Sequence, residues 1–151
     1  MKIVGIDPGT TGAIAIIEDA HFQVYDLTKF VDENDKLIRR IVTDDMHVYL
    51  ENPRGTRFVR TAKVLFRVIG GLEVSLSHTG CAVTYVEPRD WMQYLGLALG
   101  TVTANHEARR TEAYNMFPDI QPLLRRKKDH NRADAMLIAY YGWCVENETK
   151  A

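Results

Sequence analysis

Three acidic residues from distant parts of this sequence each stand at the end of an apolar segment. Asp7 follows the segment IVGI, Glu51 follows MHVYL, and Asp134 lies at the start of ADAMLIAYYG. An unpaired carboxylate is costly to bury among apolar neighbours, and a bound divalent cation relieves that cost. Carboxylate oxygens favour Mg²⁺ or Mn²⁺ over zinc. The sequence therefore predicts a metal centre, provided that the fold brings these segment ends to one edge.

Hydrophobic periodicity predicts strands and helices within one domain spanning residues 1–151, which is too short for two comfortable domains. The first three strands form an antiparallel meander. Pro53 ends the fourth strand beside Glu51, because proline cannot continue a central ladder. The expected elements are, in chain order, strands 3–6, 13–18 and 22–27, helix 32–42, strand 46–50, helix 56–77, strand 82–86, a short helix 89–95, a loop 96–103, and helices 105–116 and 133–146.

The charges are distributed unevenly although the net charge is only −1. Residues 1–50 carry 5 Lys and Arg against 9 Asp and Glu, residues 51–132 carry 13 against 8, and residues 133–151 carry 1 against 3. A basic middle between acidic ends suits a protein that holds phosphates beside a carboxylate site. No apolar run reaches the roughly 20 residues that span a bilayer, and no signal peptide is evident, so we expect a cytoplasmic protein.

Five motifs together resemble one known family. They are GIDPGTTGA at 5–13, YLENP at 49–53, VEPRDW at 86–91, HEARRTEAYNMFP at 106–118 and KKDHNRADAMLIAYYG at 127–142. The chain resembles the RuvC-like Holliday junction resolvases, in particular the compact phage-type members and the related plant chloroplast resolvase. This resemblance implies an α/β fold of the ribonuclease H-like superfamily, with a five-stranded mixed sheet, three antiparallel strands followed by two parallel strands, flanked by helices.

The resemblance also implies a crossover junction endodeoxyribonuclease with two Mg²⁺ ions per site and Mn²⁺ as a substitute. It assigns metal binding to Asp7 as the bridging ligand, to Glu51 and to Asp134. Several relatives place the fourth ligand where this chain has Asn131, which is a weaker ligand and would need a water. Asp129 matches the phage and plastid pattern and is the first candidate for the fourth ligand. His130 is the alternative, because it would share a helix face with Asp134 if the helix started early.

Other residues receive roles by the same resemblance. His106 occupies the place of a catalytic lysine, so activity would depend on pH between about 5 and 8 if only the protonated ring can donate. Arg109 and Arg110 could contact phosphates instead, and Phe58 could be an aromatic wedge that unstacks bases at the junction centre. Further phosphate contacts are expected at the mouth of the site, from Arg54, Arg57, Arg60 and Lys63.

The resemblance implies a homodimer, because a four-way junction has twofold symmetry. The long helix with Gly70 and Gly71 is the candidate dimer surface. We expect four-way junctions and other branched DNA as substrates. Two alternatives remain: a catalytically weak junction-binding protein, suggested by Asn131 and His106, and a fragment of an actin-like ATPase, which shares the strand, Asp and Gly turn but needs a second domain of this kind.

Overall fold

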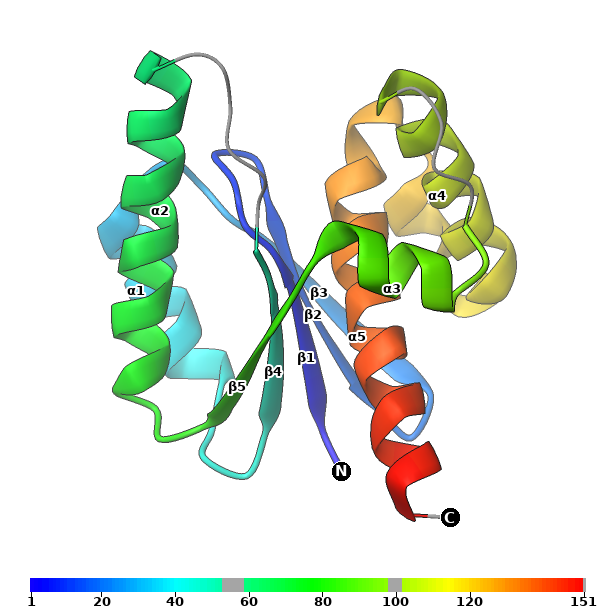
Figure 1. Cartoon of the computed structure of the whole chain (residues 1–151), viewed down its shortest axis with the longest axis horizontal. Coiled ribbons are helices and arrows are strands. Elements are labelled where there is room, and N and C mark those ends of the chain that lie inside the picture. Colours follow the sequence, from blue (N-terminus) through cyan, green and yellow to red (C-terminus); the bar gives the residue numbers. More distant parts are fainter. Residues whose placement is uncertain (53–58, 98–101, 151) are drawn as a thin grey trace.

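A five-stranded mixed sheet forms the centre of the molecule (Figure 1). The computed structural model describes residues 1–52, 59–97 and 102–150. The strands are β1 Ile3–Asp7, β2 Ala13–Glu18, β3 His21–Asp26, β4 His47–Glu51 and β5 Ala82–Val86. In the order β3-β2-β1-β4-β5, the first three strands pair antiparallel, whereas β4 pairs in parallel with both β1 and β5. This confirms the predicted sheet.

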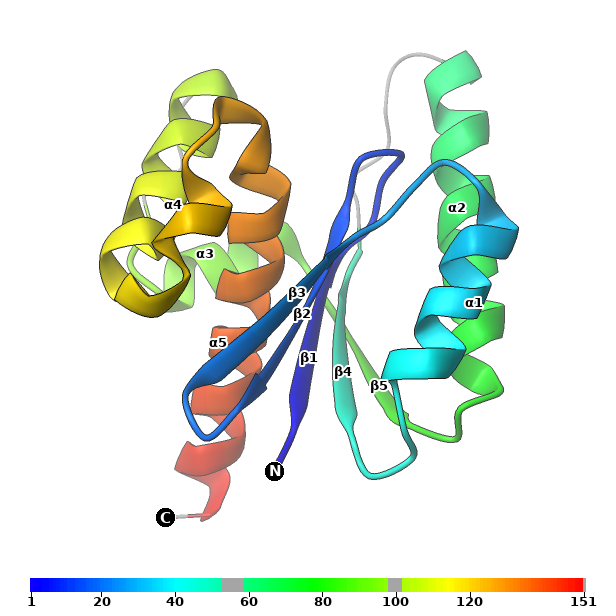
Figure 2. The same ribbon diagram turned by 180° about the vertical axis from the view of Figure 1, so that it is seen from behind.

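Helices cover both faces of the sheet. The helices are α1 Val31–Ile41, α2 Val59–Ser77, α3 Pro88–Tyr94, α4 Val102–Met116 and α5 His130–Lys150, with two 3₁₀ segments, η1 Pro118–Leu124 and η2 Lys127–Asp129. α1 and α2 lie on one face, and α3, α4 and α5 lie on the other (Figures 1 and 2). None of the helices in the described ranges is long and apolar enough to cross a membrane.

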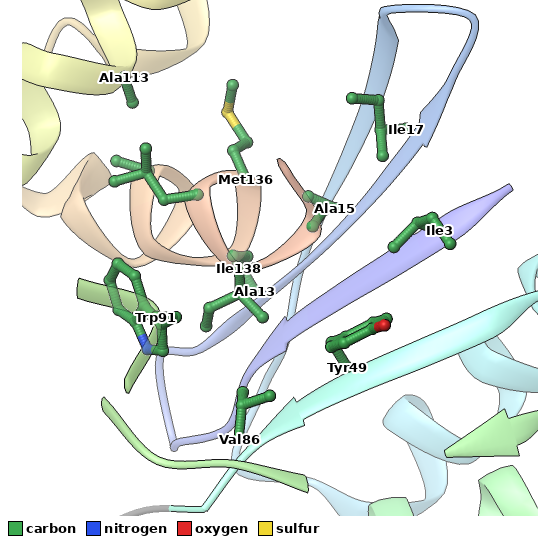
Figure 3. Packing of buried hydrophobic residues seen from close by; sticks show 14 of the residues in the cluster. Ile3, Ala13, Ala15, Ile17, Tyr49, Val86, Trp91, Ala113, Met136 and Ile138 are labelled. Atoms are coloured by element: carbon green, nitrogen blue, oxygen red, sulfur yellow. The ribbon is translucent and has the colours of Figure 1, made fainter. Parts of the chain in front are cut away.

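Strand alternation divides the apolar residues into two cores, one on each face of the sheet. Val4 and Ile6 pack with residues of α1 and α2, such as Ile38 and Leu72. The other core contains Ile3, Tyr49, Val86, Trp91, Met136 and Ile138, whose side chains meet between the sheet and α5 (Figure 3). Because side chains alternate along a strand, each residue of β1 has its face fixed by its register.

α5 lies unusually close to β1. A Cβ built on Gly5 would lie 2.3 Å from both the Ala135 carbonyl oxygen and the Ala139 nitrogen. One turn farther along α5, a Cβ on Gly142 would lie 2.5 Å from the Tyr49 ring. The small residues of α5 therefore let its backbone rest almost directly on the sheet.

The element boundaries differ from the predictions mainly around the last helix. α5 begins at His130 and ends at Lys150, whereas the sequence predicted 133–146. The first turn was missed because its residues are polar and give no apolar periodicity. η1 was not predicted because Pro118 and Pro122 lie within it, and prolines usually mark the interruption of a helix. α2 runs on through its two glycines, and Gly71 contacts Val31 of α1.

We predict that Gly5→Ala destabilises the protein by about 1–3 kcal/mol, because the added methyl group must push α5 away from β1. Gly9→Ala is the matched control, since the nearest atom to its added Cβ would be 3.7 Å away. This control should change the free energy of unfolding by less than about 0.5 kcal/mol. Urea unfolding of the two variants checks the prediction, and equal stabilities would contradict it.

Candidate active site

The topology brings Asp7 and Glu51 to the same edge and the same face of the sheet. β1 and β4 run in parallel with Ile6 opposite Leu50, and the two acidic residues directly follow this pair. Ile6 and Leu50 point into the core beneath α1 and α2. The next residue on each strand therefore points to the opposite face, toward α5.

Asp134 completes the acidic cluster from α5. It directly precedes Ala135, whose carbonyl oxygen lies against Gly5 of β1, and it is only 6% exposed. Burial raises the pKa of Asp7 well above its ordinary value, and repulsion from Asp134 and from Glu51 raises it further. The three carboxylates from distant parts of the chain thus act on one another, as the sequence predicted from their positions at segment ends.

Glu51 is held by a hydrogen bond from a tryptophan. The Trp91 ring is fully buried, and its Nε1 donates to Glu51 Oε2 at 2.7 Å. Burial raises the pKa of Glu51 to about 7; the bond from Trp91 opposes this shift, and the charge of Asp134 adds to it. Trp91, the last residue of the motif VEPRDW, is thus both a core residue and the orienting partner of Glu51.

A buried arginine offsets part of the negative charge of the cluster. Arg109 donates from Nε to Asp134 Oδ1 at 2.7 Å and from Nη2 to Oδ2 at 3.0 Å, so the ion pair is bidentate. Its guanidinium carbon also lies 5.9 Å from the centre of the Trp91 ring. Arg109 is 6% exposed and lowers the pKa of Asp7, although burial and the other acids raise it more. Arg109 is therefore committed to Asp134 in this structure, and its contact to a phosphate stays a prediction.

His106 positions this arginine through a hydrogen bond. Its Nδ1 accepts a hydrogen bond from Arg109 Nη2 at 2.9 Å, and it lies 3.8 Å from Asp134 Oδ2. Burial lowers the pKa of His106, and the charges of Arg109 and His130 lower it further. Because Nδ1 accepts, the neutral ring carries its hydrogen on Nε2 and can donate from there. The predicted need for a protonated ring therefore does not hold in this geometry.

Asp129 and His130 are consecutive but have different surroundings. The Asp129 carboxylate is 3% exposed and accepts hydrogen bonds from the Arg126 backbone N–H at 2.8 Å and from Arg126 Nη2 at 2.8 Å. Burial opposes ionisation, but the bonds from Arg126 lower the pKa of Asp129 below its ordinary value. His130 instead packs on His106, with ring centroids 4.3 Å apart. Because α5 begins at His130, this residue shares a helix face with Asp134, which was the condition for His130 as the alternative fourth ligand.

The predicted DNA contacts stay predictions, and the structure shows where some of these residues lie. Arg54, Arg57 and Phe58 lie outside the described residues. Arg60 and Lys63 are exposed in the first turns of α2. Arg110 is half-buried: it pairs with Glu107 and donates from Nη1 to the Leu124 carbonyl oxygen at 2.5 Å, so it fastens α4 to η1. Its side chain is committed within the protein rather than to the surface.

The carboxylates of Asp7, Glu51 and Asp134 suit a hard divalent cation, but two of them already have hydrogen-bond partners within the protein. Within residues 1–52, 59–97 and 102–150, no three His, Cys, Asp or Glu side chains are placed to hold one ion together. Asp134 is bound by Arg109 and Glu51 by Trp91. The pKa of Asp7 is raised mainly by burial, and repulsion from Asp134 and Glu51 adds to it. Asp7, Glu51 and Asp134 therefore fit a metal in donor chemistry, with Arg109 as the resident cation.

Comparisons with known proteins identify the fold. No model of a known protein family matches the chain, and no curated protein sequence matches it. Among solved structures, Thermus thermophilus RuvC in complex with a Holliday junction substrate matches with a TM-score of 0.63 and 15% identity, over 96% of each chain. A second structure of Thermus thermophilus RuvC matches with a TM-score of 0.63 and 16% identity, over 97% of each chain. The chain therefore has the fold of RuvC, as its motifs predicted.

Proposed function

We propose that this protein is a metal-dependent endonuclease that cuts four-way junctions and other branched DNA. The main support for this proposal is that Asp7, Glu51 and Asp134 converge at one edge of a sheet with the RuvC fold. A solved structure with this fold holds a Holliday junction substrate, which supports branched DNA as the substrate class. At 15% identity the likeness by itself supports only the fold.

The chain's own residues have distinct roles in this proposal. Two divalent ions, Mg²⁺ or Mn²⁺, would position the attacking water and stabilise the leaving oxygen when bound. Asp7 would hold these ions together with Glu51 and Asp134, since both of those carboxylates raise its pKa. Glu51 is oriented by Trp91, and Asp134 is oriented by Arg109. Trp91 is fully buried beside Glu51, and a less polar environment strengthens electrostatic interactions.

For the fourth ligand we favour His130 over Asp129. The Nδ1 atom of His130 lies 3.0 Å from the Lys127 carbonyl oxygen, to which it can only donate. This fixes the hydrogen on Nδ1 and leaves Nε2 with a lone pair, which is the form that binds a metal. His130 also precedes Asp134 by one helical turn and contacts His106. Asp129, in contrast, is occupied by Arg126.

A homodimer is supported by an apolar stripe on α2. Phe66 and Val74 are 56% and 57% exposed, and Gly70 lies between them with no heavy atom within 4 Å of its Cβ position. Residues four apart share a helix face, so these three form one stripe. A glycine in the middle allows the backbone of a second copy to approach closely. This stripe agrees with the sequence-based choice of this helix as the dimer surface.

A catalytically weak junction-binding protein is the second candidate. The observation that favours it is the ion pair of Arg109 with both oxygens of Asp134. Metal binding must compete with this pair, and breaking a buried pair is costly. Such a protein would bind branched DNA without cutting it.

We predict that the wild type nicks a synthetic four-way junction with Mg²⁺ or Mn²⁺ and that Asp7→Asn lowers the cleavage rate by at least about 1,000-fold, since a carboxylate that would hold the ions is lost. Junction binding in EDTA should stay within about threefold of the wild type. Gel assays with four-way junctions, forks and flaps measure both. Binding without cutting by the wild type would support the second candidate, and equal cutting by Asp7→Asn would exclude Asp7 from catalysis.

We also predict a pH-dependent stability in EDTA. The folded pKa of Glu51, about 7, lies above its ordinary value of 4.5, so the folded state keeps a proton that the unfolded chain releases. The free energy of unfolding should therefore fall as pH rises from about 4.5 to about 7, by up to about 3 kcal/mol from this group. Glu51→Gln should reduce this fall, whereas Glu112→Gln, at an exposed site on α4, should not. Thermal unfolding across this pH range tests it; the same fall in all three proteins would refute the assignment.

The dimer can be tested separately from catalysis. Phe66→Glu should give a monomer at micromolar concentration, because a buried charge would be placed in the interface. Leu123→Glu is the control, since Leu123 is also an exposed apolar residue, at 37%, but lies on η1. Analytical ultracentrifugation distinguishes the two. A wild type that is monomeric both alone and on a junction would refute the homodimer.

A further inference from the structure

Four consecutive cations beside the candidate site have no role in the proposed catalysis. They are Arg125 and Arg126, which lie between η1 and η2, and Lys127 and Lys128, which begin η2; all four are exposed. We name this segment, residues 125–128, the basic knuckle. His130 follows it two residues later and packs on His106, so the knuckle lies directly beside the acidic cluster.

Most of these cations lack an acidic partner. Arg126 is paired with Asp129, but across the described ranges Arg125, Lys127 and Lys128 form no ion pair. Arg109, Arg110 and Arg132 nearby all have acidic partners. Like charges in sequence repel one another, and this cost is relieved when a polyanion binds.

Buried contacts fix the knuckle in place. Asp129 is 3% exposed, and its carboxylate accepts hydrogen bonds from both the backbone and the side chain of Arg126. Lys127 contributes its carbonyl oxygen to His130 Nδ1 at 3.0 Å. At the other end, Arg110 donates to the Leu124 carbonyl oxygen at 2.5 Å. The knuckle is thus a preorganised surface, and the cost of ordering it is already met by the fold.

Resting on the proposed function, we propose that the basic knuckle holds the backbone phosphates of a DNA arm next to the cleaved strand, and that Asp129 is the anchor that positions it. Four residues span at most about 14 Å, which suits two or three phosphates along one strand. Asp129 is a positioning residue here, since it acts through Arg126. This role explains why an acidic residue follows the two lysines although its carboxylate is buried and bonded to Arg126.

The test is the salt dependence of junction binding in EDTA. The triple variant Arg125→Gln, Lys127→Gln, Lys128→Gln should bind a four-way junction about 10- to 100-fold more weakly than the wild type at 100 mM salt. The slope of log K against log salt should become shallower by about 2 to 3. The charge-matched control is Lys36→Gln, Arg40→Gln, Lys150→Gln, which removes exposed cations from α1 and from the far end of α5. It should leave the slope unchanged.

The outcomes separate this inference from the proposed function. If the wild type binds and cuts junctions but the triple variant has the slope of its control, the knuckle does not hold phosphates. If the wild type binds no branched DNA, the proposed function itself fails. Thermal unfolding should show that both triple variants remain folded.

Asp129→Asn tests the anchor. The variant should weaken junction binding and make the salt slope shallower, because the knuckle loses the charged contact that holds Arg126 in place. Its affinity for Mn²⁺ without DNA, measured by calorimetry, should equal that of the wild type, whereas His130→Ala should bind Mn²⁺ less tightly. Loss of Mn²⁺ affinity in Asp129→Asn would make Asp129 a ligand and overturn its role as an anchor.

Discussion

The contact between β1 and α5 determines where the candidate site can form. Gly5 lies against the backbone of Ala135 and Ala139, with no room for a side chain on the strand. Two residues farther along the same face comes Asp7, and one residue before Ala135 comes Asp134. The spacing of the two carboxylates therefore follows from how closely a strand and a helix can approach. Packing that looks purely structural is what assembles the acidic cluster.

The cluster then needs positive charge, and the protein supplies part of it from α4. Arg109 bonds both oxygens of Asp134, yet the pKa of Asp7 is still raised well above its ordinary value. One guanidinium does not balance three carboxylates in a buried site. The remaining imbalance is the physical reason for a metal in the proposed function. His106 and Trp91 fix the positions of charged groups in the cluster, since His106 is bonded to Arg109 and Trp91 is bonded to Glu51.

Local patterns predicted the sheet and two of the acidic positions well, because strand alternation and segment ends are properties of neighbouring residues. Asp7 and Glu51 follow apolar runs, and parallel pairing of their strands then places them together. The role of Arg109 could not be predicted in this way, since its partner is 25 residues away on another helix. Sequence spacing also favoured Asp129 as a ligand, but a capping contact to Arg126 at a 3₁₀ turn uses that carboxylate.

The start of α5 shows how one turn can separate two functions. Asp129 ends the 3₁₀ segment and faces inward to Arg126, whereas His130 begins the helix and faces His106. A change from 3₁₀ to α geometry alters the direction of successive side chains, so adjacent residues serve different neighbours. Arg132, two residues after His130, has yet another partner: it pairs with Asp26 of β3 at 2.7 Å and so connects the start of α5 to the sheet. One turn therefore holds both His130, the proposed metal ligand, and the basic knuckle, the proposed phosphate surface. A DNA strand bound by the knuckle would lie at a fixed distance from the carboxylates.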